Sequence, residues 1–81
     1  MSVTICFYSY FRDLAGCARQ EADLPEGGTL GDLLDLVAAR HPGIGALHRS
    51  TLVAVGLDYQ EPGYVLQAGD EVALFPPVQG G

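Results

Sequence analysis

The chain contains no lysine and no tryptophan, and only two of its 81 residues are cysteines. Without lysine, this chain has no side-chain amine that could accept an acyl group from a second copy of the chain. Any such acceptor would lie on a different protein. Cys6 and Cys17 form no CxxC motif and have no histidine at metal-ligand spacing, which excludes the common zinc motifs. We therefore predict two free thiols in a reducing compartment and no metal site.

Basic side chains are scarce as well. Four arginines face ten acidic residues, which gives a net charge of −6. Such a surface repels phosphate backbones and anionic lipid, so we predict no nucleic-acid partner and no membrane partner, and a basic protein surface is favoured instead. The longest apolar stretch, residues 3–11, is too short to span a bilayer and lacks the pattern of a signal peptide. The expected location is the cytoplasm.

The composition is that of a small globular protein. Hydrophobic residues make up 48% of the chain and charged residues 17%, which is far from a disordered composition. A chain of this length can bury one modest core. We predict a single domain over residues 1–81, in which residues 76–81 form a flexible C-terminal tail.

Alternating polarity predicts strands at both ends of the chain. Val3, Ile5 and Phe7 fall on one face of the first segment, which we assign to the core. Thr4, Cys6 and Tyr8 fall on the other face. In the last strand, residues 71–75, the same alternation directs Phe75 outward. Further strands are predicted at residues 19–24 and 52–55, and in the latter Val53 and Val55 are assigned to the core. A short pairing segment is predicted at 65–66, with turns at 25–28, 56–59 and 62–63.

One clear helix is predicted, and it begins after Thr29. The Thr29 hydroxyl can cap the first turn, with Asp32 at the position of a capping-box carboxylate. The sequence His41-Pro42-Gly43 ends the helix, and we interpret His41 as a partner of the helix dipole. His48 has no recognisable partner, and residues 12–16 suggest a short helical turn. The apolar stripe of the helix consists of Leu30, Leu33, Leu34, Val37 and Ala38.

The order of elements is strand, strand, helix, strand, short strand, strand. It predicts an α+β domain of the ubiquitin-like, β-grasp kind: a mixed sheet of four to five strands with one main helix packed across it. In this arrangement the first and last strands lie side by side in the centre of the sheet. Tyr8 and Phe75 would then share the outer face, with Tyr59 joining them from the neighbouring turn.

The segment that follows the last strand favours a reactive end. Pro76 and Pro77 cannot donate to a β-ladder, so the chain must leave the sheet in an extended form. Gly80 and Gly81 have no Cβ and can enter a narrow channel, so that a terminal carboxylate would reach the active site of another protein. A frayed end without function is the alternative, because small residues are common at chain ends.

Several segments resemble those of a known family: Phe7, residues 12–16, 25–34 and 52–55, and above all residues 69–81, which read Gly-Asp-Glu-Val-Ala-Leu-Phe-Pro-Pro-Val-Gln-Gly-Gly. Over nearly its whole length the chain resembles the sulfur-carrier small subunit of molybdopterin synthase, a relative of the thiamine-pathway sulfur carrier and of ubiquitin. Tyr8 and Tyr59 depart from the family pattern, which more often has phenylalanine and an aliphatic residue there.

The resemblance implies a carrier without an active site of its own. An adenylyltransferase of the ubiquitin-activating kind would use ATP to activate Gly81, and a persulfide sulfur donor would convert it into a thiocarboxylate. The large subunit of molybdopterin synthase, in a heterotetramer, would use this sulfur to build the dithiolene of molybdopterin from cyclic pyranopterin monophosphate. No cofactor would be bound. The implied tail consists of Pro76, Pro77, Val78, Gln79 and Gly80, and the implied partner interface of Tyr8, Arg12, Tyr59 and Phe75.

Two other functions stay open. The chain could carry sulfur for thiamine, cysteine or the tungsten cofactor, because a Gly-Gly end and adenylation are common to these pathways. It could also be a passive ubiquitin-like module that binds partners through its sheet or becomes linked to a target lysine. Independent catalysis is not expected, since the sequence has no Cys/His pair, paired carboxylates or metal-spaced cluster.

Overall fold

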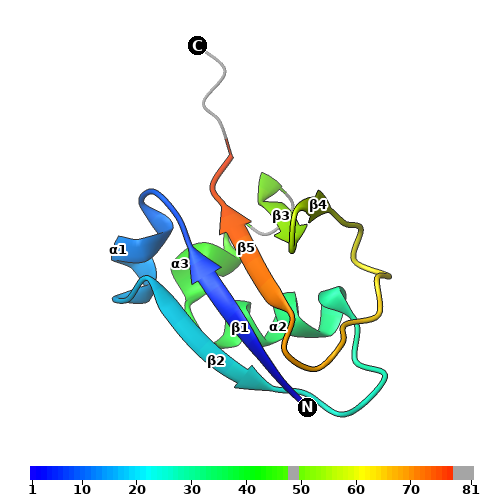
Figure 1. Ribbon diagram of the computed structural model, residues 1–81. Helices are drawn as coiled ribbons and strands as arrows, with labels where there is room; N and C mark the ends of the chain where they lie inside the picture. The colour runs from blue at the N-terminus through cyan, green and yellow to red at the C-terminus, as the bar shows by residue number, and fades with distance from the viewer. Residues whose placement is uncertain (48–49, 78–81) are drawn as a thin grey trace.

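The computed structural model describes residues 1–47 and 50–77. Figure 1 shows a twisted sheet with a helix behind it, and the C-terminal strand (orange) lies beside the N-terminal strand (blue) in the sheet. The strands are β1 (Ser2–Phe7), β2 (Arg19–Asp23), β3 (Leu52–Val55), β4 (Asp58–Tyr59) and β5 (Glu71–Phe75), and the helices are α1 (Phe11–Ala15), α2 (Leu30–Arg40) and α3 (Pro42–Gly45).

The five strands form one mixed sheet in the order β2-β1-β5-β3-β4. The first and last strands, β1 and β5, lie side by side in parallel at its centre, and Ile5 pairs with Val72. All other neighbouring strands are antiparallel. This is the ubiquitin-like β-grasp arrangement, so the predicted fold class and the central pairing of the first and last strands are confirmed.

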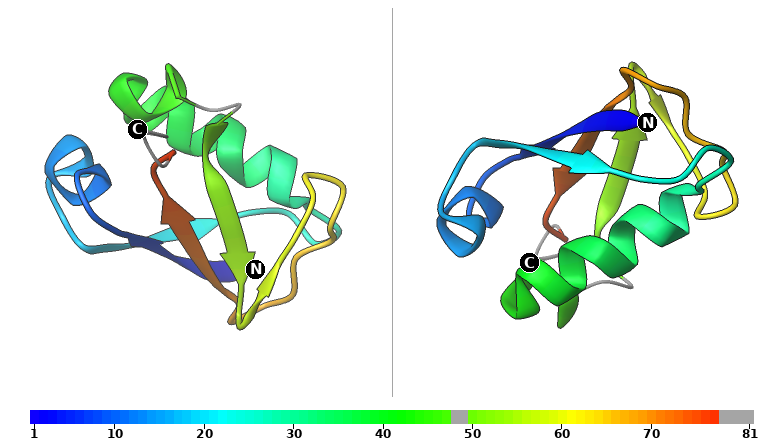
Figure 2. Two further views of the ribbon diagram at one scale, coloured as in Figure 1. Left: turned by 90° about the horizontal axis from the view of Figure 1, so that it is seen from above. Right: turned by 90° about the horizontal axis from the view of Figure 1, so that it is seen from below.

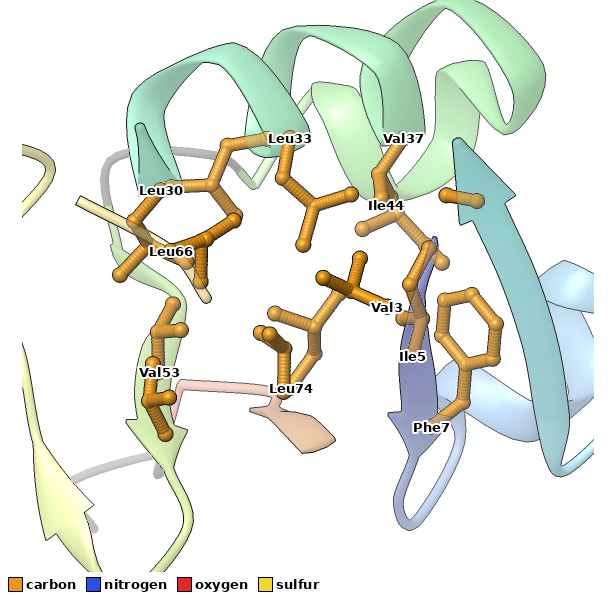
Figure 3. Close-up of a cluster of buried hydrophobic side chains, with 14 of the residues drawn as sticks. Val3, Ile5, Phe7, Leu30, Leu33, Val37, Ile44, Val53, Leu66 and Leu74 are labelled. Carbon is orange, nitrogen blue, oxygen red and sulfur yellow. The ribbon is translucent and has the colours of Figure 1, made fainter. Parts of the chain in front are cut away.

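The core lies between the sheet and α2, which crosses one face of it (Figure 2). Val3, Ile5 and Phe7 point from β1 toward the helix and are at most 2% exposed, as the alternation predicted. Figure 3 shows these side chains packed against the apolar stripe of α2 and against Leu74 of β5. The buried members of the stripe are Leu30, Leu33, Leu34 and Val37.

A capping box begins α2 where the sequence predicted it. The Asp32 backbone N–H donates to the Thr29 hydroxyl at 3.2 Å, and the Thr29 backbone N–H donates to the Asp32 carboxylate at 2.9 Å. Two N–H groups that the helix itself cannot pair are satisfied in this way. The short turn at 12–16 is also confirmed, as α1, which ends at Gly16 in the left-handed conformation.

Replacing Thr29 by alanine is expected to lower the free energy of unfolding by about 1 kcal/mol, because one of the capped N–H groups loses its partner. For a domain of this size the change corresponds to a fall in Tm of about 4–8 °C. Thermal unfolding followed by circular dichroism measures it. Ser2→Ala, which removes an exposed hydroxyl from β1, is the matched control and should leave the Tm unchanged; an equal Tm in both variants would contradict the assigned cap.

The fifth strand lies at a different place from the one predicted. Residues 56–59 were expected to form a turn, but only Gly56 and Leu57 turn the chain, and β4 pairs back on β3 with Tyr59 opposite Ala54. Gly56 has a φ of 62°, which suits a two-residue hairpin loop. The short strand predicted at 65–66 is reduced to one bridge between Val65 and Thr29. A two-residue strand is too short to show alternation, so the pattern placed the pairing in the wrong segment.

The end of α2 also differs in part from the prediction. His41 ends α2, but Pro42 then opens the short helix α3, since a proline is well suited to the first position of a helix. The His41 ring packs edge-on against Phe7, with ring centroids 5.5 Å apart, and its Nε2 lies 3.2 Å from the Gln20 side-chain oxygen. His41 therefore joins the helix to β2, and His48 lies outside the described residues.

The two cysteines are free thiols, as predicted: Cys6 is buried and Cys17 is partly exposed. Within residues 1–47 and 50–77, no three histidine, cysteine, aspartate or glutamate side chains form a group that could hold a metal ion. None of the helices that the structure describes is long and apolar enough to cross a membrane.

Candidate protein-docking site

A cluster of large apolar side chains occupies the outer face of the sheet, on the side away from α2. At its centre, Tyr8 and Phe75 stack with ring centroids 4.7 Å apart and an angle of 14° between the rings. Tyr8 follows directly after β1, and its N–H donates to the Leu74 carbonyl at 3.2 Å. The β1–β5 pairing therefore continues to Tyr8 and fixes the stack beside the last residue of β5.

The register of the sheet adds residues from the next two strands. Leu52 lies directly opposite Phe75, and Tyr59 lies opposite Ala54, so all of these side chains are on the same face. Tyr8 is 45% exposed, Leu52 44% and Tyr59 69%, although each is large and mainly apolar. We call these four residues, Tyr8, Leu52, Tyr59 and Phe75, the outer patch.

A hollow of about 470 Å³ adjoins the outer patch where the chain leaves β5. Pro76 is buried and Pro77 is half-buried within the wall of this hollow. The residues predicted as tail therefore begin inside an apolar surface, and Val78, Gln79, Gly80 and Gly81 lie outside the described residues. The hollow, hereafter the tail hollow, is lined by Ser9, Tyr10, Leu52, Tyr59, Phe75, Pro76 and Pro77.

Arg12, the fourth residue of the predicted interface, lies on α1 and is exposed. Its Nε donates to the Ser9 carbonyl at 3.4 Å. Since Ser9 lines the tail hollow, the Arg12 guanidinium is close to that rim but is not one of the lining groups. The structure thus brings Tyr8, Tyr59 and Phe75 together and places Arg12 next to them.

The other half of the outer face is charged. Arg19 of β2 lies opposite Cys6, and Glu71 of β5 lies opposite Thr4, so their side chains meet across β1, with an N–O distance of 2.8 Å. Both side chains are more than half exposed, so this ion pair adds little to stability. Its position over β1 is consistent with the burial of Cys6, which the alternation had directed outward. The outer patch therefore has a polar border on one side.

Leu52 and Tyr10 belong to this site, but the sequence analysis did not single them out. The assignment of Val53 and Val55 to the core already implied an outward Leu52, so strand parity could have found it. Tyr10 carries no such signal, since it precedes α1 in a turn and reaches the tail hollow only through the tertiary structure.

The arrangement suits docking to another protein. An exposed apolar patch with aromatic side chains at its centre and a polar border has the composition of a protein–protein interface. Pro76 and Pro77 emerge beside it, so a partner bound to the outer patch also meets the chain that follows β5.

Comparisons with known proteins identify the family of the chain. The ThiS family matches residues 5–81. The molybdopterin synthase sulfur carrier subunit of Chlamydomonas reinhardtii is 31% identical, with 100% of both chains covered. Small archaeal modifier protein 1 of Haloferax volcanii is 34% identical over 85% of this chain and 88% of the relative. The crystal structure of SAMP1 from Haloferax volcanii has a TM-score of 0.88 and 28% identity, with full coverage of both chains. The chain belongs to the ThiS family.

Proposed function

We propose that this chain is a sulfur carrier, the small subunit of a molybdopterin synthase. The observation that carries the proposal is the outer patch beside Pro76 and Pro77, which offers a docking surface next to the segment that ends in Gly80 and Gly81. The sulfur carrier subunit of Chlamydomonas reinhardtii, which is similar over the full length of both chains, supports the choice of pathway.

The chemistry takes place at the Gly81 carboxylate. A carboxylate is a poor electrophile, so it first attacks the α-phosphorus of ATP and releases pyrophosphate, which yields an acyl adenylate with AMP as the leaving group. The terminal sulfur of a persulfide donor then displaces AMP and forms an acyl disulfide with Gly81. A second thiol of the donor cleaves its S–S bond, which leaves Gly81 as a thiocarboxylate and the donor as a disulfide. An adenylyltransferase of the ubiquitin-activating kind holds the ATP, so this chain needs no bound cofactor and no catalytic residue.

The sulfur is then delivered to the large subunit of molybdopterin synthase. Tyr8, Tyr59 and Phe75 bind that subunit, with Arg12 at the edge of the contact, and residues 76–81 enter its active site. Two successive thiocarboxylates supply the two sulfurs that convert cyclic pyranopterin monophosphate into the dithiolene product. A heterotetramer places one carrier at each large subunit. The acid–base groups of the reaction belong to the partner.

A second candidate is a protein modifier whose Gly81 forms an amide with a lysine of a target. The similarity to small archaeal modifier protein 1 favours it, because that relative is 34% identical and its structure superposes with a TM-score of 0.88. Activation by adenylation is the same for both candidates. They differ in the acceptor, which is sulfur for the carrier and an amine for the modifier.

The deciding experiment loads the chain with sulfur and supplies it to a large subunit. The activating enzyme, ATP and a persulfide donor are added, and intact mass spectrometry detects the exchange of oxygen for sulfur. The loaded chain is mixed with the large subunit and cyclic pyranopterin monophosphate, and the dithiolene product is measured. Product in proportion to thiocarboxylate is the expected result.

Other outcomes separate the alternatives. A chain that loads but yields no product carries sulfur for another pathway, such as thiamine, cysteine or tungsten-cofactor synthesis. A chain that becomes linked to lysines of a target protein under the same conditions is a modifier. A chain that never reacts with ATP acts only through its sheet face.

A further inference from the structure

The turn between β1 and α1 contains an unusual backbone conformation. Ser9 has a φ of 55°, and within residues 1–47 and 50–77 it is the one residue other than glycine with a positive φ. This region is unfavourable for a residue with a Cβ and is often found where the position of neighbouring groups matters for function. The other described turns of this kind use glycine: Gly16, Gly27, Gly56 and Gly69.

The conformation of Ser9 is held by the fold on both sides. Phe7 before the turn is 2% exposed and Phe11 after it is 0% exposed, so both ends of the turn are anchored in the core. The Arg12 N–H donates to the Ser9 carbonyl at 3.1 Å, and the Phe11 N–H donates to the Tyr8 carbonyl at 3.1 Å. Three exposed residues are therefore carried on a short, fixed loop between two buried phenylalanines.

This loop reaches the point where the chain leaves β5. Ser9 and Tyr10 line the tail hollow together with Pro76 and Pro77. The Tyr10 ring is itself fixed by an edge-on contact with Phe11, with ring centroids 5.6 Å apart and an angle of 82°. Tyr10 is thus a well-supported side chain beside the two prolines.

Side-chain packing is the main force that can orient this segment. Pro76 and Pro77 have no N–H groups, so no ladder hydrogen bond donated by them can fix the chain to a neighbouring strand. We propose that the Ser9–Tyr10 turn is a positioning element: it sets the direction of Pro76 and Pro77, and through them the presentation of Gly81 to the activating enzyme. The proposal rests on the proposed function, and it adds Ser9 and Tyr10 as positioning residues.

Serine, unlike glycine, restricts the turn. Glycine at position 9 would relieve the unfavourable φ and also give the loop more conformations. Ser9→Gly is therefore expected to leave the Tm equal or raise it, while the orientation of Pro76 and Pro77 becomes less defined. A residue with a purely structural role would not combine these two effects.

The test measures orientation and activity separately. Residual dipolar couplings of the Cα–Hα bonds of Pro76 and Pro77 are recorded for the unaltered chain, Tyr10→Ala, Tyr10→Phe and Ser9→Gly, with Ser2→Gly as the control. The couplings should fall toward zero in Tyr10→Ala and Ser9→Gly, relative to those of β5. They should be retained in Tyr10→Phe, which keeps the ring, and in the control.

Chain-dependent exchange of pyrophosphate into ATP by the activating enzyme gives the second readout. Because misplacement of a reacting group by about 1 Å costs up to about 100-fold in rate, Tyr10→Ala should lower kcat at least about tenfold. Its KM should stay within about twofold of the unaltered value, since the substitution leaves the four residues of the outer patch in place. Tyr10→Phe should restore kcat.

Each result has a clear meaning. Unchanged couplings in Tyr10→Ala and Ser9→Gly overturn the proposal without any enzyme being involved. Reduced couplings with an unchanged kcat show that the orientation does not matter for the reaction, which also overturns it. An activating enzyme that leaves even the unaltered chain unmodified contradicts the proposed function instead, and the couplings still decide whether the turn orients the two prolines.

Discussion

Replacing Phe75 by alanine is expected to weaken binding of the chain to the large subunit of molybdopterin synthase by about 30-fold or more. Phe75 lies at the centre of the outer patch, stacked on Tyr8 and opposite Leu52. Central aromatic side chains of this kind commonly contribute about 2 kcal/mol or more to binding, and 2 kcal/mol corresponds to about 30-fold in Kd. Isothermal titration calorimetry with the separate subunits measures the change.

Two further variants distinguish binding from stability. Tyr59→Ala removes a side chain that is 69% exposed, so it should weaken binding with little change in Tm. Val65→Ala is the matched control, since Val65 is 48% exposed but lies away from the outer patch, next to Thr29. A Kd that is equal for Phe75→Ala and Val65→Ala would show that the large subunit does not use the outer face of the sheet.

The fold could be predicted because its main elements have long, regular patterns. Val3, Ile5 and Phe7 alternate through a whole strand, and the stripe that begins at Leu30 repeats through a whole helix. The Thr29 cap fixed the start of that helix within one residue. Patterns of this length reflect burial on one face, which is the term that dominates folding.

Short elements could not be predicted in the same way. β4 has two residues, both exposed, so no burial pattern marks it, and its existence depends on pairing with β3 through the Gly56 turn. The helix α3 follows a proline that the sequence analysis used as a stop signal, although the same residue can begin a helix. In both cases the deciding contacts are tertiary.

The site was predictable in part for a related reason. The pairing of the first and last strands places Tyr8 beside Phe75, and parity directs both outward, so the stack follows from topology alone. The roles of Ser9 and Tyr10 could not be predicted. Residue spacing indicates neither the positive φ of Ser9 nor the position of this turn beside Pro76. Sequence patterns report burial along one element, whereas this part of the site joins a turn to the end of a distant strand.

Deletion of Gly81 is expected to abolish thiocarboxylate formation, even though the shortened chain would still end in glycine. Four residues follow Pro77 and can span at most about 14 Å when extended. Removing one of them draws the carboxylate back by about 3.5 Å, and a displacement of that size is several times the ~1 Å that already costs about 100-fold in rate. Intact mass spectrometry after incubation with the activating enzyme, ATP and persulfide donor detects the loss.

The control restores length without restoring the sequence. A glycine inserted after Val78 in the shortened chain returns the terminal carboxylate to its original distance from Pro77, and loading should recover in large part. The Tm should be the same in all three chains, because each of them keeps every residue of the buried core that the structure describes, including those of β1, α2 and β5. Loading that is lost in both altered chains would mean that the activating enzyme recognises the Gly-Gly pair itself. Loading that persists in the shortened chain would mean that the distance from Pro77 to the terminal carboxylate does not limit the reaction, and the role of the tail hollow as the fixed origin of the tail would have to be abandoned.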